Sequence, residues 1–243
     1  MLRQFALIAA LVVATLAAGL AHAQSVDLTA YSALLGKYVN AQGMVAYAKL
    51  KTDAAPLDAF LGKLAAARPE TFSTDTERLA FWINAYNASV LKGVLAHYPL
   101  DSVMSVSSFF KEQAYTIAGE KLSLDQIENQ KIRPVYHDPR VHVALVCGAK
   151  SCPRLLNRAY AGVGLDAQLD QQFREFLADA TKNRFEAAGP VARISQIFKW
   201  YAGDFGALPA FLKKFAPPAA QPLLASPALS LQYLDYDWKL NAQ

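Results

Sequence analysis

The chain has 243 residues, of which 53% are hydrophobic, and its formal net charge is +4 at pH 7. This length is enough for one domain with a sizeable core, and we find neither an internal repeat nor a second domain. The charged residues are interspersed rather than gathered into a basic stripe, so we expect no nucleic-acid partner. The sequence carries no readable signal for the oligomeric state.

The first 23 residues have the pattern of a secretory signal peptide. Arg3 supplies a positive start, an apolar run follows from Phe5 to Leu20, and Ala21-His22-Ala23 matches the small-residue cleavage site. A run of about 16 apolar residues is short for a membrane span. We therefore predict a signal peptide over 1–23 and a single globular domain over 24–243. The mature protein is expected to be periplasmic or secreted, with no membrane span after cleavage.

Hydrophobic spacing and capping residues predict mainly helices in the first half of the mature chain. Thr74 and Glu77 form a capping box ahead of the strongest helical segment, which stops before Pro99. Ser123 and Gln126 form a second capping box for a shorter helix, which Pro134 is expected to close. The expected elements are helices over 28–38, 56–67, 76–98 and 123–132, a short strand over 44–47, and a hairpin over 115–122.

The second half mixes strands and helices. Val141 to Cys147 is nearly continuous and β-branched, which is typical of a buried strand. The other expected elements are helices over 166–182 and 207–215, a helix capped by Ser195, and strands over 191–194 and 229–236. Helices and strands alternate irregularly, without a glycine-rich phosphate loop. The fold class is therefore α+β, a helix-rich single domain around a small, mainly antiparallel sheet.

The stretch RVHVALVCGAKSCPRLL places His142 ahead of the chain's two cysteines, Cys147 and Cys152. In a regular strand, His142 and Cys147 would point to opposite faces about 16 Å apart, so we expect no direct contact between them. His142 could serve Cys152 only if the chain turns back at Gly148. Pro153 is compatible with a helix that starts at Cys152, and the free amides of such a helix would lower the pKa of the thiol.

Three interpretations of the two cysteines stay open. A disulfide between Cys147 and Cys152 leads, because they are the only cysteines of a chain expected in an oxidising compartment. A catalytic or redox thiol comes next, with Cys152 or Cys147 as the nucleophile and His142 as the base. A metal site on the same three residues matches no standard zinc spacing, so we predict no metal and no cofactor.

Polar residues elsewhere are candidates for lining a ligand cleft. Asn84 and Asn87 share one face of a mainly apolar helix, where amides are mediocre helix formers. Glu128 lies on a short helix, and Arg140 lies beside His142. Each also has a structural interpretation, because the amides could hold loops in the core and the charged residues could form buried ion pairs.

Five stretches, in this order, resemble the family known as domain of unknown function 547 (DUF547): FWINAYNASVLKGVL, LSLDQIENQKIRP, DPRVHVALVCGAKSCPRL, IFKWYAGDFG and YLDYDWKLN. The resemblance covers about residues 30–241 and implies no settled activity. In that family a histidine often follows the glutamate of the second stretch, whereas this chain has Asn129 there.

A polar helix followed by a strand with an early histidine is also similar to the order found in papain-like and transglutaminase-like thiol enzymes. Those enzymes place the nucleophilic cysteine at the start of the central helix. This chain has no cysteine there, and Asn84 occupies the middle of the helix. A cysteine of the 147–152 loop would have to replace the usual nucleophile.

The predicted function is that of an exported binding or accessory protein for a small or peptide-like ligand, with the cysteines at the rim of a polar cleft. The residues expected to line the cleft are Asn84, Asn87, Glu128, Arg140 and His142. The alternative is a thiol-dependent acyl-transfer or hydrolase enzyme that uses Cys152 or Cys147 with His142, and a redox or metal-handling module is the third hypothesis. Binding is preferred because no nucleophile and base have a spacing that ensures contact.

Overall fold

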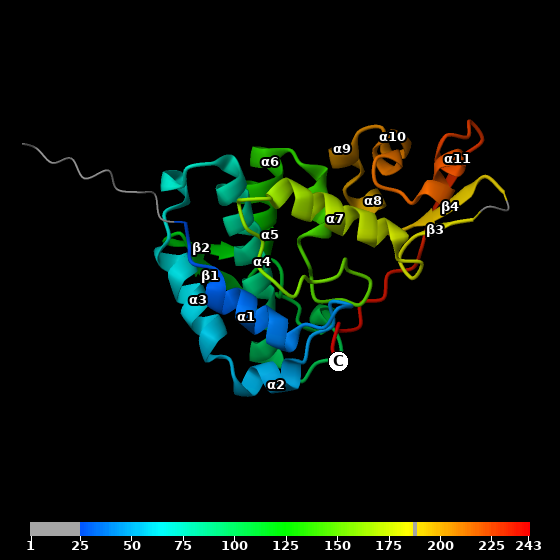
Figure 1. Ribbon diagram of the computed structural model, residues 1–243. Coiled ribbons are helices and arrows are strands. Elements are labelled where there is room, and N and C mark those ends of the chain that lie inside the picture. Colours follow the sequence, from blue (N-terminus) through cyan, green and yellow to red (C-terminus); the bar gives the residue numbers. More distant parts are fainter. Residues whose placement is uncertain (1–24, 187–188) are drawn as a thin grey trace, which may run out of the picture.

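The computed structural model describes residues 25–186 and 189–243 and has the helix-rich α+β architecture that the sequence predicts. The predicted signal peptide, residues 1–23, lies outside the described residues. Within the described ranges, no helix is both long enough and apolar enough to cross a bilayer. The buried side chains form two hydrophobic cores. The larger one includes the helix α4 (Asp75–His97) and the smaller one includes the short helices between Ile197 and Leu224, and Figure 1 shows these two groups of elements in different parts of the molecule.

The larger core surrounds α4 (Asp75–His97), which is buried along most of its length. The predicted capping box starts this helix, because Glu77 N–H donates to the Thr74 hydroxyl and Thr74 N–H donates to the Glu77 carboxylate. Three helices complete this side of the molecule: α1 (Thr29–Tyr38), α2 (Tyr47–Thr52) and α3 (Ala55–Ala66). The strand expected over 44–47 is reduced to isolated bridges at Val45, because the chain turns directly into α2.

The predicted hairpin is present as β1 (Ala114–Ile117) and β2 (Glu120–Ser123), paired antiparallel. Its turn holds Ala118 and Gly119 at positive φ. The chain then forms α5 (Leu124–Gln126), a π-helix (Ile127–Ile132) and α6 (Arg133–Tyr136) in succession. Pro134 does not close this helical stretch as predicted, since it occupies the first turn of α6, where a missing N–H is tolerated.

The strand expected over 141–147 is absent, which corrects the sequence prediction. Residues Pro139–Val143 form a 3-10 helix, and the following residues are irregular. The side-chain amide of Asn87, on α4, forms the hydrogen bonds that a partner strand would otherwise form. Its Nδ2 donates to the Ala144 carbonyl and its Oδ1 accepts from Val146 N–H. Pro153 likewise begins no helix, so Cys152 does not lie at a helix N-terminus.

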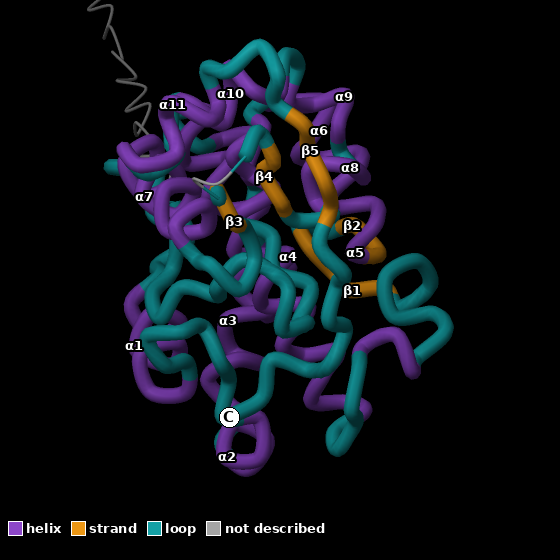
Figure 2. Tube along the Cα trace, turned by 90° about the vertical axis from the view of Figure 1, so that its right-hand side faces the viewer, coloured by secondary structure: helices purple, strands orange, loops and turns teal. Residues whose placement is uncertain are grey.

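The smaller core packs α7 (Leu165–Ala178) against a three-stranded sheet of order β3-β4-β5 and a group of short helices. The strands are β3 (Arg184–Phe185), β4 (Val191–Ile194) and β5 (Ser230–Tyr233); β3 runs antiparallel and β5 parallel to β4 (Figure 2). The short helices are α8 (Ile197–Trp200), α9 (Ala202–Phe205), α10 (Leu208–Lys213) and α11 (Gln221–Leu224).

After β5 the chain returns from the smaller core to the larger one and ends near α2 in both views (Figures 1 and 2). On the way it hydrogen-bonds to the cysteine loop: Lys150 N–H donates to the Lys239 carbonyl and Asn241 N–H donates to the Gly148 carbonyl. Asn241 is also held in the core by the Tyr47 hydroxyl at 2.8 Å. The C-terminal segment, residues 234–243, therefore holds the cysteine loop, residues 147–152, against the larger core.

Candidate functional site

A cavity of about 210 Å³ lies where the two cores meet. Its walls combine residues of the larger core, such as Tyr86 and Leu145, with Ile197 of the smaller core and residues of the C-terminal segment. The residues that line it are Tyr86, Phe110, Asp125, Glu128, Asn129, His142, Leu145, Cys147, Cys152, Pro153, Ile197, Trp200, Tyr201, Tyr236 and Trp238. Most of the wall is therefore aromatic or apolar, and the polar groups are few.

The cavity is also where the five DUF547-like stretches of the sequence converge. Every lining residue except Phe110 comes from one of them. These stretches are spread from residue 81 to residue 241, so only the tertiary structure brings them to one place.

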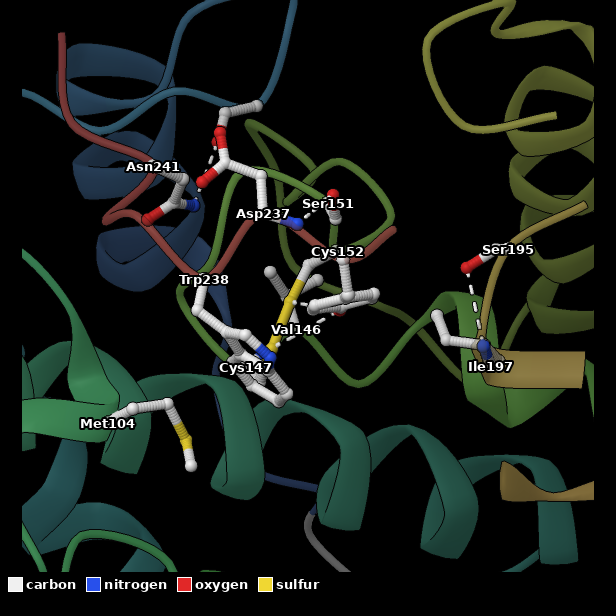
Figure 3. The surroundings of a disulfide bond; sticks show 12 residues. Met104, Val146, Cys147, Ser151, Cys152, Ser195, Ile197, Asp237, Trp238 and Asn241 are labelled. Carbon is white, nitrogen blue, oxygen red and sulfur yellow. Dashed lines mark hydrogen bonds between the residues drawn. A yellow bond between two sulfur atoms is a disulfide. The ribbon is translucent and has the colours of Figure 1, made fainter. Parts of the chain in front are cut away.

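The cysteine pair forms one wall of the cavity. The sulfur atoms of Cys147 and Cys152 are 2.18 Å apart, at disulfide-bonding distance, as the sequence analysis favoured. The Cys152 sulfur accepts hydrogen bonds from the Tyr236 hydroxyl and from Cys147 N–H, both at 3.2 Å. Trp238 lies alongside the disulfide, and the neighbouring Asp237 N–H is held by the Ser151 hydroxyl (Figure 3).

His142 lies on the same cavity as the cysteines and is 3% exposed. The predicted separation of His142 and Cys147 on opposite faces is wrong, because the segment between them is not a strand. The ring stacks on Tyr201 with centroids 3.9 Å apart, and its Nε2 is 2.7 Å from the Asp204 carboxylate. Burial lowers the pKa of His142 to about 4, against the effect of Asp204. The imidazole is therefore neutral at pH 7.

Asp204 is held in place by Arg133, whose Nε and Nη2 donate to its two oxygens at 2.7 and 3.0 Å. The hydrogen bond from Arg133 and the one from His142 keep the pKa of Asp204 below its usual value, against its partial burial. An ionised Asp204 can only accept hydrogen bonds, so Nε2 of His142 carries the hydrogen atom and is the donor of this hydrogen bond. The Arg133 guanidinium also lies over the Tyr201 ring, 4.8 Å from its centroid.

Glu128 is the buried acid of the cavity. It lies on the π-helix, an irregularity often found at functional sites, and is 9% exposed. Burial raises the pKa of Glu128, although the hydroxyl of Tyr201 and the charge of Arg133 oppose this. Within the described residues Glu128 forms no salt bridge. A buried acid without a cationic partner is uncommon, since ionised side chains are seldom buried unless they are paired.

The structure separates the other predicted cleft residues from this cavity. Asn84 and Asn87 are buried in α4 and hold irregular backbone: Asn84 bonds to Tyr160 N–H and C=O, as Asn87 does for the 144–146 segment. Arg140 pairs instead with acidic side chains, namely Asp138, Asp166 and Asp170. The structural interpretations considered for these three residues describe the contacts observed.

Sequence reasoning missed the aromatic residues of the cavity and the acid that orients His142. Trp200, Tyr236 and Trp238 form a cluster. The ring centroids are 4.8 Å apart for Trp200 and Tyr236, 4.6 Å for Tyr236 and Trp238, and 5.6 Å for Trp200 and Trp238. Asp204, Tyr236 and Trp238 all lie in the last two DUF547-like stretches. That placement was the one available signal, because aromatic residues at these spacings are otherwise typical of a core.

The described residues contain no group of three or more histidine, cysteine or acidic side chains that could hold a metal ion. The fold and site define a helix-rich α+β domain with an aromatic cavity, one buried acid and a disulfide wall. The family model described as "Protein of unknown function, DUF547" matches residues 69–177, and this region belongs to that family. The match is narrower than the expected 30–241 and includes three of the five stretches. No curated protein and no solved structure matches the chain significantly.

The comparison with papain-like and transglutaminase-like enzymes depended on a strand at 141–147. That strand is absent, so the order of elements that suggested the comparison is not present in this fold.

Proposed function

We propose that this protein is an exported binding protein and that its ligand occupies the cavity beside the Cys147–Cys152 disulfide. The observation that carries the proposal is Glu128, a buried acid on the cavity wall without a salt bridge to any described residue. Burial of an acid costs free energy, and such groups are concentrated at functional sites. Tyr201 offers Glu128 a hydroxyl group, and a bound ligand would supply a further polar partner in place of the missing salt bridge.

The size of the cavity and the composition of its wall favour a small ligand. Its volume of about 210 Å³ is below the range of about 300–1,000 Å³ typical of sites for drug-sized molecules. A mainly apolar wall with a few convergent polar groups is the usual composition of a small-molecule site. The polar residues here are Asp125, Glu128, Asn129 and the neutral His142, and three tyrosines of the lining carry hydroxyl groups.

The thiol enzyme is the second candidate, and it is favoured by the presence of His142, Cys147 and Cys152 on one cavity. Two observations make it the weaker proposal. Both sulfurs are at disulfide distance, and a histidine with a pKa of about 4 is a poor general base at neutral pH, where an efficient base has a pKa near the working pH. Alkylation of the denatured, unreduced protein followed by intact mass decides the point, because two alkylated cysteines would favour the enzyme.

The binding proposal is tested by thermal-shift screening against periplasmic metabolites and cell-wall fragments. Asn129 is exposed at the cavity, so Asn129→Trp is expected to block entry without disturbing the core. Its neighbour Gln130 is equally exposed but does not line the cavity, which makes Gln130→Trp the matched control. A saturable rise in melting temperature in the wild type and Gln130→Trp, lost in Asn129→Trp, would support the proposal. No rise in melting temperature with any compound, or equal rises in all three proteins, would contradict it.

A further inference from the structure

The charges around the cavity are unbalanced in one direction. Among the described residues that line it, Asp125 and Glu128 are acids and there is no lysine or arginine. The nearest guanidinium, Arg133, donates from Nε and Nη2 to Asp204 and from Nη1 to Asn129 at 2.6 Å. Arg133 is bonded to Asp204 and Asn129, so neither acid of the cavity forms a salt bridge with it, although its charge also acts on Glu128.

The state of Glu128 depends on what occupies the cavity. Burial raises the pKa of this carboxyl group, because the charged form loses hydration that no salt bridge replaces. A cation within a few Å would favour the ionised form again. A neutral ligand would leave the free-energy cost of ionising Glu128 unchanged. An anionic ligand would raise that cost.

Another part of the wall is built of aromatic rings. Trp200, Tyr236 and Trp238 are in mutual contact, and Trp200 is 47% exposed although it is one of the largest apolar side chains. Figure 3 shows Trp238 beside the disulfide at this wall. The faces of aromatic rings carry negative partial charge and attract cations, tryptophan most strongly, and groups of such rings recognise methylated ammonium ions.

We infer that the cavity binds a small organic ammonium ion, held between the Glu128 carboxylate and the rings of Trp200, Tyr236 and Trp238. The inference rests on the proposed function, since it names the ligand class of that same site. An apolar substituent on nitrogen suits the apolar remainder of the wall, and the charge suits the acids. A hydrated inorganic cation fits poorly, because aromatic rings cannot replace its oxygen ligands.

The test uses three probes of one shape and different charge. They are choline, the neutral alcohol in which carbon replaces the choline nitrogen, and the carboxylate with the same tertiary butyl group. Tetramethylammonium and benzylamine extend the cationic set. Binding to the mature protein is measured by titration calorimetry, with Asn129→Trp as the blocked variant. The cations are expected to bind saturably, and the neutral and anionic probes about tenfold or more weaker.

Two substitutions separate the acid from the aromatic wall. Glu128→Gln preserves shape and is expected to weaken choline binding by about tenfold or more while leaving the neutral alcohol unchanged. Glu120→Gln is the matched control, because Glu120 is exposed, pairs with Lys131 and does not line the cavity. Trp238→Leu keeps an apolar side chain but removes a ring face, so it is expected to weaken choline by about threefold or more and the alcohol less.

The outcomes distinguish failure of the ammonium ligand from failure of the proposed binding function. Equal or tighter binding of the neutral or anionic probe, lost in Asn129→Trp, would overturn the ammonium ligand but retain a ligand-binding cavity. No saturable binding of any cation up to millimolar concentrations would also overturn the inference. The thermal-shift screen, with its uncharged and acidic compounds, would then judge the binding function alone.

Discussion

The larger and the smaller core are built in different ways, and the candidate site lies between them. The larger core has α4, a single regular helix of 23 residues, as its longest element. The smaller core gathers helices α8 to α11, none longer than six residues, around α7. The long helix gives the cavity a fixed wall with Tyr86, and the short helices bring Trp200 and Tyr201 to face it.

The cavity belongs to neither core alone. Tyr236 packs against both cores and reaches the cavity between them. The walls of the cavity therefore stay in place only while the two cores remain packed together. Three experiments test how stable that packing is.

The largest effect is expected from truncating the centre of either core. Ile83 and Phe173 are both 0% exposed, so Ile83→Ala and Phe173→Ala are each expected to lower the free energy of unfolding by about 2–5 kcal/mol. Helix α7 carries Leu169 in the larger core and Phe173 in the smaller one, one turn apart. We therefore expect one cooperative transition in both variants, with circular dichroism and tryptophan fluorescence coinciding in denaturant. A separate early transition in Phe173→Ala would show instead that the smaller core unfolds alone.

A pH-dependent effect is expected from His142, which lies at the junction. Its pKa is about 4 in the folded protein and near 6.5 when unfolded, so on acidification the unfolded chain takes up the proton first. The stabilisation is complete above pH 6.5 and is lost as the pH falls towards 4, by on the order of 3 kcal/mol.

Unfolding free energies measured between pH 4 and 7 check this expectation. His142→Asn should flatten the profile in that window. His137→Asn is the control, because His137 is exposed and its φ of 50° is one that asparagine tolerates. An unchanged slope in His142→Asn would assign the pH dependence to other groups.

The smallest of the three effects is expected from reduction of the disulfide. Cys147 and Cys152 close a loop with a sequence separation of 5, which in the chain-entropy account is worth about 2 kcal/mol. The reduced protein should remain folded, since the C-terminal segment also holds this loop through Lys150 and Asn241. Denaturant melts with and without reductant measure the loss, and a double Cys→Ser variant should not respond to reductant. Equal midpoints for the oxidised and reduced wild type would argue against the disulfide.

Local signals in the sequence predicted those elements that depend on neighbouring residues. The capping box of Thr74 and Glu77 and that of Ser123 and Gln126 are both confirmed. The hairpin around Ala118-Gly119 is also confirmed, since its turn needs only the residues within it. In each case the hydrogen-bond partners lie within a few residues, so the sequence pattern contains the whole interaction.

The segment 141–147 shows where local reasoning failed. Its β-branched residues favour a strand, but a strand needs a partner, and the backbone at Ala144 and Val146 is bonded by the Asn87 side chain instead. The same arrangement at Asn84 and Tyr160 explains why two amides occur in an apolar helix. Without the long-range contacts, the sequence could not decide between the two interpretations of the amides, and it predicted the wrong element for the segment.

The sequence by itself determined the fold class and the main helices, which follow from composition, periodicity and short-range bonding, and its motifs indicated the family of the central region. It favoured a disulfide among three interpretations of Cys147 and Cys152, whose sulfur atoms lie at disulfide distance in the structure. Only the tertiary structure decided that Glu128, His142, the disulfide and the rings of Trp200 and Tyr236 share one cavity, while Arg140 does not. The physical reason is that burial and charge balance depend on which residues are neighbours in space, and the residues that line this cavity lie up to 152 positions apart in the sequence, from Tyr86 to Trp238.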